Sequence, residues 1–388
     1  MSSYVLSEIA EVVDCEHKTA PTVEDSQYHS IRTTDIANGK IHIDKANRVS
    51  EDTYLKWSRR AIPEPGDIIL AREAPVGEVG WIAEGYKVCL GQRTVLLKVT
   101  HNGVSKKFLL YYLVNPDTRY NLQARATGSV VAHLNVKDIR GFSVSLPSLS
   151  EQKAIASVLS SLDDKIDLLH RQNKTLEAMA ETLFRQWFVE EAEIQSENQL
   201  TLGELIESVS ITHRLQTDTI IFLNTSDIYK GDILNNSQVN VNSLPGQAKK
   251  SIQRNDILFS EIRPANGRWA YIHFDAEDYV VSTKLMVLRS KGFLSQAFVY
   301  FFLTNSQTID WLQLLAESRS GTFPQITFDQ LKDLKINIPS KSILSNSIEW
   351  CESALKKINS NLTQIRTLET LRDTLLPKLM SGEVRVAV

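Results

Sequence analysis

The chain has 388 residues, with a hydrophobic fraction of 42% and a charged fraction of 23%, which is enough for two globular domains and argues against wholesale disorder. A formal net charge of −3 excludes a strongly basic protein, so a nucleic-acid interface would need local basic clusters or a partner that supplies positive charge. No run approaches the roughly 18 apolar residues of a membrane span. The start of the chain lacks a basic segment followed by an apolar run, so we expect no signal peptide.

The cysteines and the short periodic runs indicate a cytoplasmic protein of mixed α and β structure. Cys15, Cys89 and Cys351 lie far apart, which is typical of free thiols in a reducing compartment. Apolar and β-branched runs bounded by Gly, Pro and Asn predict strands, and longer apolar periodic runs predict helices. In chain order, the expected strands or turn-and-strand pieces are 39–44, 66–71, 94–99, 142–146, 230–234, 285–288 and 335–338, and the expected short helices are 105–115 and 294–315.

A long helix is predicted in the middle of the chain. Ser148, followed three residues later by Glu151, forms a capping-box signature before an apolar run. From there, apolar residues step by 4 and 3 in the pattern of a coiled-coil seam. The seam positions are Ile155, Leu159, Leu162, Ile166, Leu169, Asn173, Leu176, Ala180, Leu183 and Trp187. Asn173 is the polar member, and a buried Asn in a seam fixes register at a cost in stability.

A second long helix is predicted near the end of the chain. Its seam has similar spacing but starts without the capping Glu, because Ile343 stands at that position. We expect Pro377 to end this helix and a short strand-like tail to follow. The seam positions are Ile348, Cys351, Leu355, Ile358, Leu362 and Ile365, continued less regularly by Leu368, Leu371 and Leu375.

The chain contains an internal repeat with an offset of 192 residues. Ile31–Ile36 returns as 223–228, Leu146-Pro-Ser returns as Ile338-Pro-Ser, and Leu176-Glu returns as Leu368-Glu. Matches in the same order along both halves indicate a tandem duplication.

The repeat predicts an α+β protein with two similar mixed α/β domains. The expected divisions are a first globular domain over 1–147, a central helix over 148–192, a second globular domain over 193–339, and a C-terminal helix and tail over 340–388. Because one seam cannot be hidden alone, we expect the two helices to pair antiparallel with pseudo-two-fold symmetry. The alternative is that each helix packs on its own globular domain.

Several segments resemble the specificity subunits of type I restriction-modification systems. Residues 146–179, LPSLSEQKAIASVLSSLDDKIDLLHRQNKTLEAM, resemble the central region of these subunits, and residues 368–386, LETLRDTLLPKLMSGEVRV, resemble their C-terminal region closely. TTDI (33–36) and PGDIILA (65–71) are similar to pieces of their target recognition domains. IPSKSILSN, at the start of the second helix, departs from the pattern.

The resemblance implies a subunit without catalysis of its own. It would bind a bipartite site in double-stranded DNA, with each recognition domain reading one half. Its partners would be two methyltransferase subunits, which methylate adenine with S-adenosylmethionine, and restriction subunits that use ATP and Mg²⁺ to cut unmethylated DNA. The paired helices would set the spacing of the half-sites and dock the methyltransferases.

Motifs for other activities are missing from the sequence. There is no GxxxxGK[ST] phosphate loop, HExxH or paired Cys, so we expect no cofactor, ATP hydrolysis or metal site in this chain. VNPDTRY (114–120) lacks the second Pro and the aromatic residue of the amino-methyltransferase loop.

Candidate DNA contacts are side chains able to hold phosphates or read base edges, gathered in loop-like stretches. In the first domain they are Lys45, Arg48, Lys56, Trp57, Arg59, Arg60, Arg125 and His133. In the second domain they are Lys249, Lys250, Arg263, Arg268, Arg319, Thr322 and Gln325. For any one of them, a solvated surface role is the simpler interpretation.

Apolar residues outside the seam are candidates for partner docking, namely Phe184, Phe188 and Leu376, unless they pack on the adjacent globular domain. The competing hypothesis for the whole chain is a coiled-coil scaffold that links two protein-interaction modules and never touches DNA. A relic methyltransferase with enzymatic activity is a further alternative.

Overall fold

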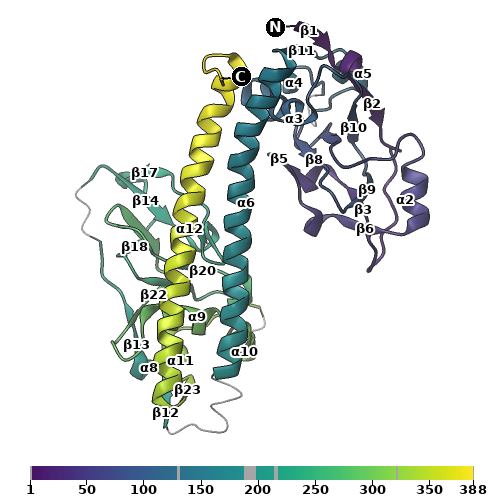
Figure 1. Cartoon of the computed structure of the whole chain (residues 1–388). Coiled ribbons are helices and arrows are strands. Elements are labelled where there is room, and N and C mark those ends of the chain that lie inside the picture. Colours follow the sequence, from purple (N-terminus) through teal and green to yellow (C-terminus); the bar gives the residue numbers. More distant parts are fainter. Residues whose placement is uncertain (1, 129–131, 188–197, 214–216, 320–321, 388) are drawn as a thin grey trace. The chain divides into compact units, whose positions relative to one another are not determined.

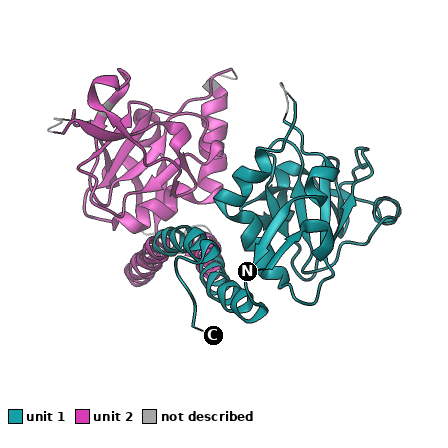
Figure 2. Cartoon of the chain, turned by 90° about the horizontal axis from the view of Figure 1, so that it is seen from above, with its two compact units in different colours: residues 1–167, 365–388 teal, residues 168–364 magenta. Residues whose placement is uncertain are grey.

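The computed structural model describes residues 2–128, 132–187, 198–213, 217–319 and 322–387. The chain divides into two compact units, residues 1–167 with 365–388 and residues 168–364 (Figure 2). Each unit therefore contains one globular part and a portion of each long helix. Among the described residues, no helix combines the length and apolar character needed to span a membrane.

Unit 1 is built on two sheets and a short strand pair (Figure 1). The largest sheet has six strands in the order β2 (Ala10–Asp14), β10 (Thr94–Val99), β7 (Ile68–Ala71), β8 (Val79–Trp81), β5 (Gly39–Ile41) and β4 (Ile36–Ala37). The second sheet has the order β6 (Asn47–Val49), β3 (Tyr28–Ile31) and β9 (Lys87–Leu90), with β3 parallel to β9. The strand pair joins β1 (Ser2–Val5) to β11 (Ser143–Leu146).

Short helices complete the first globular part. They are α1 (Leu6–Ile9), α2 (Glu51–Trp57), α3 (Lys106–Val114), α4 (Pro116–Gln123) and α5 (Val136–Arg140). Ser105 caps α3 by accepting a hydrogen bond from Phe108 N at 3.4 Å, and Phe108 and Leu109 are then buried in the core. The same core contains Ile155 and Leu159 from the long helix α6 (Leu149–Arg185).

Unit 2 repeats the main strand pairings, but β15 and β16 form a separate two-stranded sheet and β18 adds a fourth strand to the second sheet. Its sheets have the orders β13-β22-β19-β20 and β17-β14-β21-β18, and again the first and last strands of the globular part, β12 and β23, pair with each other. The strands are β12 (Asn198–Thr201), β13 (Ile206–Val209), β14 (Thr219–Leu223), β15 (Ile228–Tyr229), β16 (Asp232–Ile233), β17 (Gln238–Asn240), β18 (Ala248–Ser251), β19 (Ile257–Ser260), β20 (Trp269–Tyr271), β21 (Tyr279–Ser282), β22 (Leu285–Ser290) and β23 (Lys335–Ile338). The helices are α8 (Leu202–Leu205), α9 (Gln296–Thr304), α10 (Ser306–Arg319) and α11 (Phe328–Leu331), followed by the long helix α12 (Lys341–Ser381).

Equivalent pairings identify the two globular parts as copies of one unit. The parallel pair β3·β9 corresponds to β14·β21, and the antiparallel pair β7·β10 corresponds to β19·β22. Gly39 and Gly231, at the tips of the β4–β5 and β15–β16 hairpins, both have positive φ. The predicted fold class, two similar mixed α/β domains with two long helices, is confirmed.

The long helices run antiparallel within each unit. In unit 2, Asn361 donates to Asn173 at 2.7 Å and Trp350 lies beside Trp187 with ring centroids 6.3 Å apart. In unit 1, Arg372 and Asp163 form an ion pair. Both helices also pack on the globular parts, since Ile155 and Leu376 share one core and Phe184 and Leu355 share the other. The two packing alternatives raised by the sequence are therefore both realised.

Three expectations about the helices are wrong. Pro377 lies inside α12, which continues to Ser381, because losing one backbone N–H removes only one helical hydrogen bond. The tail over 382–387 forms no strand. Phe184 and Leu376 are not exposed docking residues, because each is buried against the adjacent globular part. Phe188, the third docking candidate, lies outside the described residues.

Candidate nucleic-acid interface

The basic segment of the first globular part lies at α2, beside the three-stranded sheet. Ser50 caps α2 by accepting a hydrogen bond from Thr53 N at 3.2 Å. Lys56 pairs with Asp52 at 2.6 Å, and Arg48 on β6 pairs with Asp25 at 2.6 Å. Exposed ion pairs of this kind contribute little to stability, so their cations can exchange a carboxylate for a phosphate.

Other members of this segment hold the fold together. Trp57 packs on the cluster that contains Tyr28 and Cys89, and its Nε1 donates to Lys18 O at 3.4 Å. Arg60 Nη1 donates to Cys15 O at 2.9 Å. The expected cations that stay exposed at this surface without a bond to the core are Lys45, Arg48, Lys56 and Arg59.

A second polar group in unit 1 lies where the β7–β8 loop meets the segment before α5. Glu73 forms an ion pair with Arg93 at 2.9 Å and lies 2.5 Å from His133 Nδ1. Beneath them, the buried guanidinium of Arg72 contacts Asp14 at 2.9 Å and His133 Nε2 at 2.7 Å. The Arg93 side chain is 53% exposed and the Glu73 side chain 13%, so the cation faces solvent above a largely buried carboxylate.

Unit 2 has a counterpart at the equivalent place. Lys284 pairs with Glu261 at 3.3 Å and donates to Gln325 Oε1 at 3.3 Å. Gln325 lies 192 residues after His133, and Arg93 and Lys284 lie between β9 and β10 and between β21 and β22, respectively. We call these two groups the polar triads: Glu73, Arg93 and His133 in unit 1, and Glu261, Lys284 and Gln325 in unit 2.

Two further candidates adjoin the unit 2 triad. Arg263 has a left-handed backbone (φ 42°) before Pro264, and its Nη2 donates to Thr322 O at 3.3 Å. The exposed Thr322 and the partly buried Gln325 therefore belong to the same surface as Arg263. The side chains of Lys249 and Arg319 lie outside what the structure describes.

Three of the expected DNA contacts are tied to the protein backbone or core. Arg125 donates to Gly141 O and lies over the Phe142 ring, with the guanidinium carbon 4.9 Å from its centroid. Arg268 donates to Ile228 O at 2.8 Å. Lys250 Nζ donates to Thr283 O and Leu285 O, and burial lowers the pKa of this amine. These bonds leave the three side chains holding loops and strands.

The sequence analysis missed four members of the triads: Glu73, Arg93, Glu261 and Lys284. Arg93 and Lys284 are single cations next to a strand, without a basic cluster around them. Alignment of the two copies was a signal for the cations, because equivalent strand pairings place Arg93 at the position of Lys284 and His133 at the position of Gln325. It was no signal for the carboxylates, because Glu261 takes the place of Arg72 and not of Glu73.

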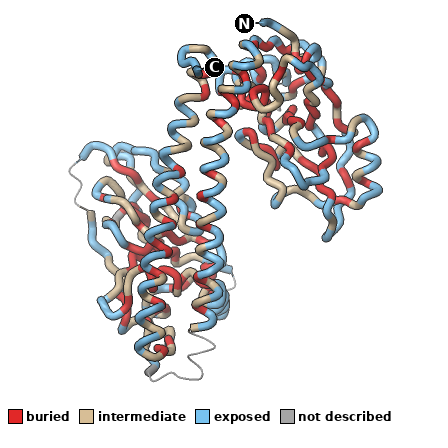
Figure 3. Tube along the Cα trace, in the orientation of Figure 1, coloured by how far each residue is buried: buried red, intermediate tan, exposed pale blue. Residues whose placement is uncertain are grey.

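The seam residues differ in burial along both helices (Figure 3). Ile155, Leu159, Ile166, Leu169, Asn173, Leu355, Ile358 and Ile365 are buried, whereas Leu162, Leu176, Leu183 and Leu362 are partly buried. Asn361 is fully buried next to Leu362 and was missed. The repeat offset was the missed signal, since position 361 is the equivalent of seam residue Leu169.

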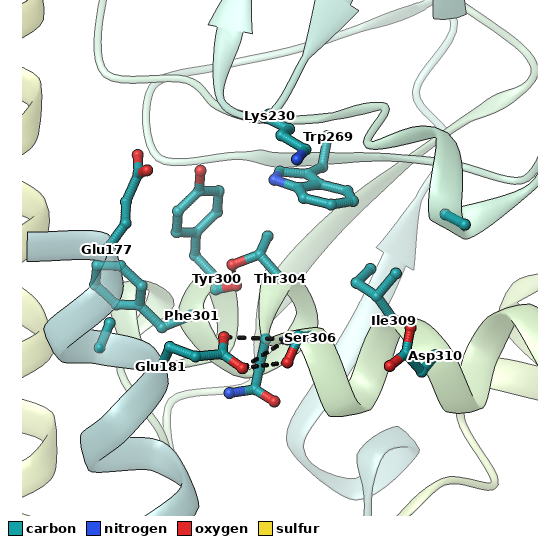
Figure 4. A pocket seen from close by; sticks show the side chains of 13 residues that line it. Glu177, Glu181, Lys230, Trp269, Tyr300, Phe301, Thr304, Ser306, Ile309 and Asp310 are labelled. Atoms are coloured by element: carbon teal, nitrogen blue, oxygen red, sulfur yellow. Dashed lines mark hydrogen bonds between the residues drawn. The ribbon is translucent and has the colours of Figure 1, made fainter. Parts of the chain in front are cut away.

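A cavity of about 300 Å³ lies between α6 and the globular part of unit 2 (Figure 4). Glu181 on α6 accepts hydrogen bonds from Ser306 N at 3.1 and 3.2 Å and from Ser306 Oγ, at the start of α10. A carboxylate at a helix N-terminus is stabilised by the unpaired N–H groups there. These hydrogen bonds attach α6 to the globular part of unit 2 at one side of the cavity.

One group in unit 1 has ligand types that suit a metal. Atoms of Asp14, Cys15 and His17 lie within 4.8 Å of one another. The Asp14 carboxylate is already shared by Arg72, at 2.9 Å, and His17, at 2.8 Å, so these neighbours compensate its charge.

The family model for the type I restriction modification DNA specificity domain matches residues 1–178 and 198–366. The chain belongs to this family. A specificity subunit of the type I enzyme HindI from Haemophilus influenzae is 38% identical over 177 residues, which is 45% of this chain and 39% of that protein. The type I enzyme MjaIX specificity subunit from Methanocaldococcus jannaschii is 25% identical over 385 residues, covering 92% of this chain and 86% of that protein.

A solved structure shares the fold of this specificity-family chain. The S subunit of a type I restriction-modification system from M. genitalium superposes with a TM-score of 0.64 at 17% identity, covering 97% of this chain and 95% of that one. The family membership favours the specificity-subunit reading over the scaffold hypothesis, and specificity subunits are in general non-catalytic.

Proposed function

We propose that this chain is the DNA sequence-recognition subunit of a type I restriction-modification complex, and that each globular part reads one half of a bipartite site. The observation that carries the proposal is the pair of polar triads. Equivalent places in two copies of one scaffold present different side chains, Arg93 with His133 in one and Lys284 with Gln325 in the other. Both ring nitrogens of His133 are engaged, Nδ1 with Glu73 and Nε2 with Arg72, so His133 would act by positioning the carboxylate that holds Arg93.

This arrangement suits recognition of two unlike half-sites. Arg and Lys donate to the O6 and N7 acceptors of guanine, and Gln pairs with adenine through N6 and N7. The largely buried carboxylates Glu73 and Glu261 would orient the cations and compensate their charge. The exposed cations at α2, including Lys56 and Arg59, would hold phosphates without reading sequence.

The assembled complex would supply the chemistry. Two methyltransferase subunits and two restriction subunits are the proposed partners, with S-adenosylmethionine, ATP and Mg²⁺ used by them. Near-neutral charge in this chain means that the partners provide much of the attraction to phosphates. The divisions at residues 147, 192 and 339 and the cytoplasmic location stay predictions.

The methylated motif tests the proposal. The chain is co-expressed with its methyltransferase partner and the methylome is sequenced. His133→Ala should relax one half of the motif, and Gln325→Ala should relax the other half only. Lys98→Ala, which removes a partly buried cation paired with Glu64 on unit 1, is the matched control and should leave the motif unchanged. An unaltered motif in both triad variants would contradict the assignment of base reading to the triads.

The long helices are proposed to set the number of base pairs between the half-sites and to dock the methyltransferases. Inserting one heptad into both α6 and α12 keeps the seam in phase. The variant should methylate a motif with a longer spacer, and an unchanged spacer would show that the helices do not set it.

A further inference from the structure

The helix seam of unit 2 contains a hydrogen-bonded pair of buried amides. Asn361 Nδ2 donates to Asn173 Oδ1 at 2.7 Å and also lies 3.4 Å from Gln172 Oε1. Asn361 is 0% exposed and Asn173 is 6% exposed. This bond satisfies Asn361 Nδ2 and Asn173 Oδ1, whereas Asn361 Oδ1 is buried without a hydrogen-bond partner. An amide that faces an aliphatic side chain would lose this bond as well and would carry the full cost of desolvation.

The two asparagines occupy non-equivalent positions of the internal repeat. The repeat offset of 192 residues carries Asn173 onto Ile365 and carries Asn361 onto Leu169. Each helix therefore has one amide and one aliphatic side chain at these two seam positions, in opposite order along the chain. Such an arrangement makes the two helices unlike each other at the point where they would otherwise be interchangeable.

Pairing of like helices from two copies of the chain would break this match. In an antiparallel pair of two α6 helices with the same register, Asn173 of each copy would face Leu169 of the other copy. In a pair of two α12 helices, Asn361 would face Ile365 of the second copy. Either pair would bury two amides against aliphatic side chains, whereas α6 with α12 buries two amides against each other.

We propose that Asn173 and Asn361 form a pairing code that directs α6 to α12 and rejects self-association of the chain through like helices. Buried polar residues at single seam positions select partners in coiled coils by this physics. Two unpaired buried amides disfavour the like pairing by about a hundredfold or more in its equilibrium constant. The apolar seam positions shared by both helices, such as Ile166 and Ile358, provide no such discrimination.

The proposal is tested in the full-length chain by moving the asparagine of α12 to α6. Leu169→Asn combined with Asn361→Leu gives α6 two amides and leaves the seam of α12 without one. Two copies of such an α6 can pair their amides with each other, and two copies of α12 bury none. This variant should self-associate at least about tenfold more tightly than the unmodified chain, measured by sedimentation equilibrium.

The matched control is Asn173→Leu combined with Asn361→Leu, which removes both amides without exchanging them. It should keep the pairing of α6 with α12 and self-associate less than the exchanged variant. Equal self-association of the exchanged variant and this control would overturn the proposal.

A double-mutant cycle keeps the test decisive if the exchanged variant does not fold. Asn173→Leu and Asn361→Leu alone should each lower the urea midpoint of unfolding, and the double variant should recover it. Additive effects of the two substitutions would show that the amides do not act as a pair and would also overturn the proposal.

Discussion

Arg372 on α12 forms an ion pair with Asp163 on α6 at 3.0 Å, and Tyr111 of α3 donates its hydroxyl to the same carboxylate at 2.7 Å. The three groups join both long helices to the globular part within unit 1. Burial, and then the hydrogen bond to Asp163, raise the pKa of Tyr111, which keeps this phenol protonated as the donor.

Arg372→Met should destabilise unit 1 by about 1–3 kcal/mol, because Asp163 is left largely buried without its cation. Urea unfolding followed by circular dichroism measures the change. Lys356→Met, at an exposed position on the same helix, is the control and should be nearly neutral. Equal unfolding midpoints for the two variants would show that the ion pair contributes nothing.

Gln152→Leu should lower the stability of unit 1 by about 2–4 kcal/mol. Gln152 is buried near the start of α6, where its Oε1 accepts from Ser105 N at 2.9 Å and its Nε2 donates to Gly103 O and Pro147 O. Removing the amide leaves these three backbone groups unsatisfied. The exposed neighbour Lys153→Leu provides the comparison in thermal unfolding, and a loss no larger than in that control would refute the anchoring role.

Gly91→Ala should destabilise unit 1 by about 2–4 kcal/mol because a Cβ at this position would lie 2.3 Å from Ile31 O. Gly91 N donates to the same oxygen at 2.8 Å, so neither backbone can move away without losing the bond. A Cβ at Gly246 meets nothing within 4 Å, so Gly246→Ala should change little. Chemical denaturation of both variants compares them, and equal stability would contradict the close approach.

His29 should make stability depend on pH. Burial, and then the nearby Arg48 guanidinium, lower the pKa of His29, which stands opposite Arg48 in the β3·β6 ladder. The unfolded chain, with a histidine pKa of about 6.5, therefore binds this proton more readily than the folded chain. The contribution of neutral His29 is complete above that pH and is lost as the pH falls below it. The wild type should lose more stability between neutral and mildly acidic pH than His29→Asn, and parallel pH profiles would exclude His29 as the cause.

The fold was largely predictable because the tandem duplication leaves matching segments at a constant separation in the sequence. Matches at 192 residues identified two copies before any element was assigned, and the capping Ser148 placed the start of α6 to within a residue. Pro377 misled the prediction because packing of the last turns of α12 on the core of unit 1, through Leu376 and Leu379, outweighs one missing hydrogen bond.

The candidate site was less predictable because it depends on loops that meet in space. Lys56 and Arg59 could be found from a local cluster of charge. Arg93 could not, since its partner Glu73, and His133 that shares this carboxylate, lie twenty and forty residues away in the sequence. Composition also could not reveal that the guanidinium groups of Arg60 and Arg268 donate hydrogen bonds to backbone carbonyls.

Unit 1 is discontinuous, with residues 168–364 inserted between its two pieces. Its core includes Leu376 and Leu379, which leave the ribosome only after all of unit 2 has been made. All residues of unit 2 are thus available for folding before those of unit 1, and the part of the protein that is synthesised first must wait for the last helix before its core closes.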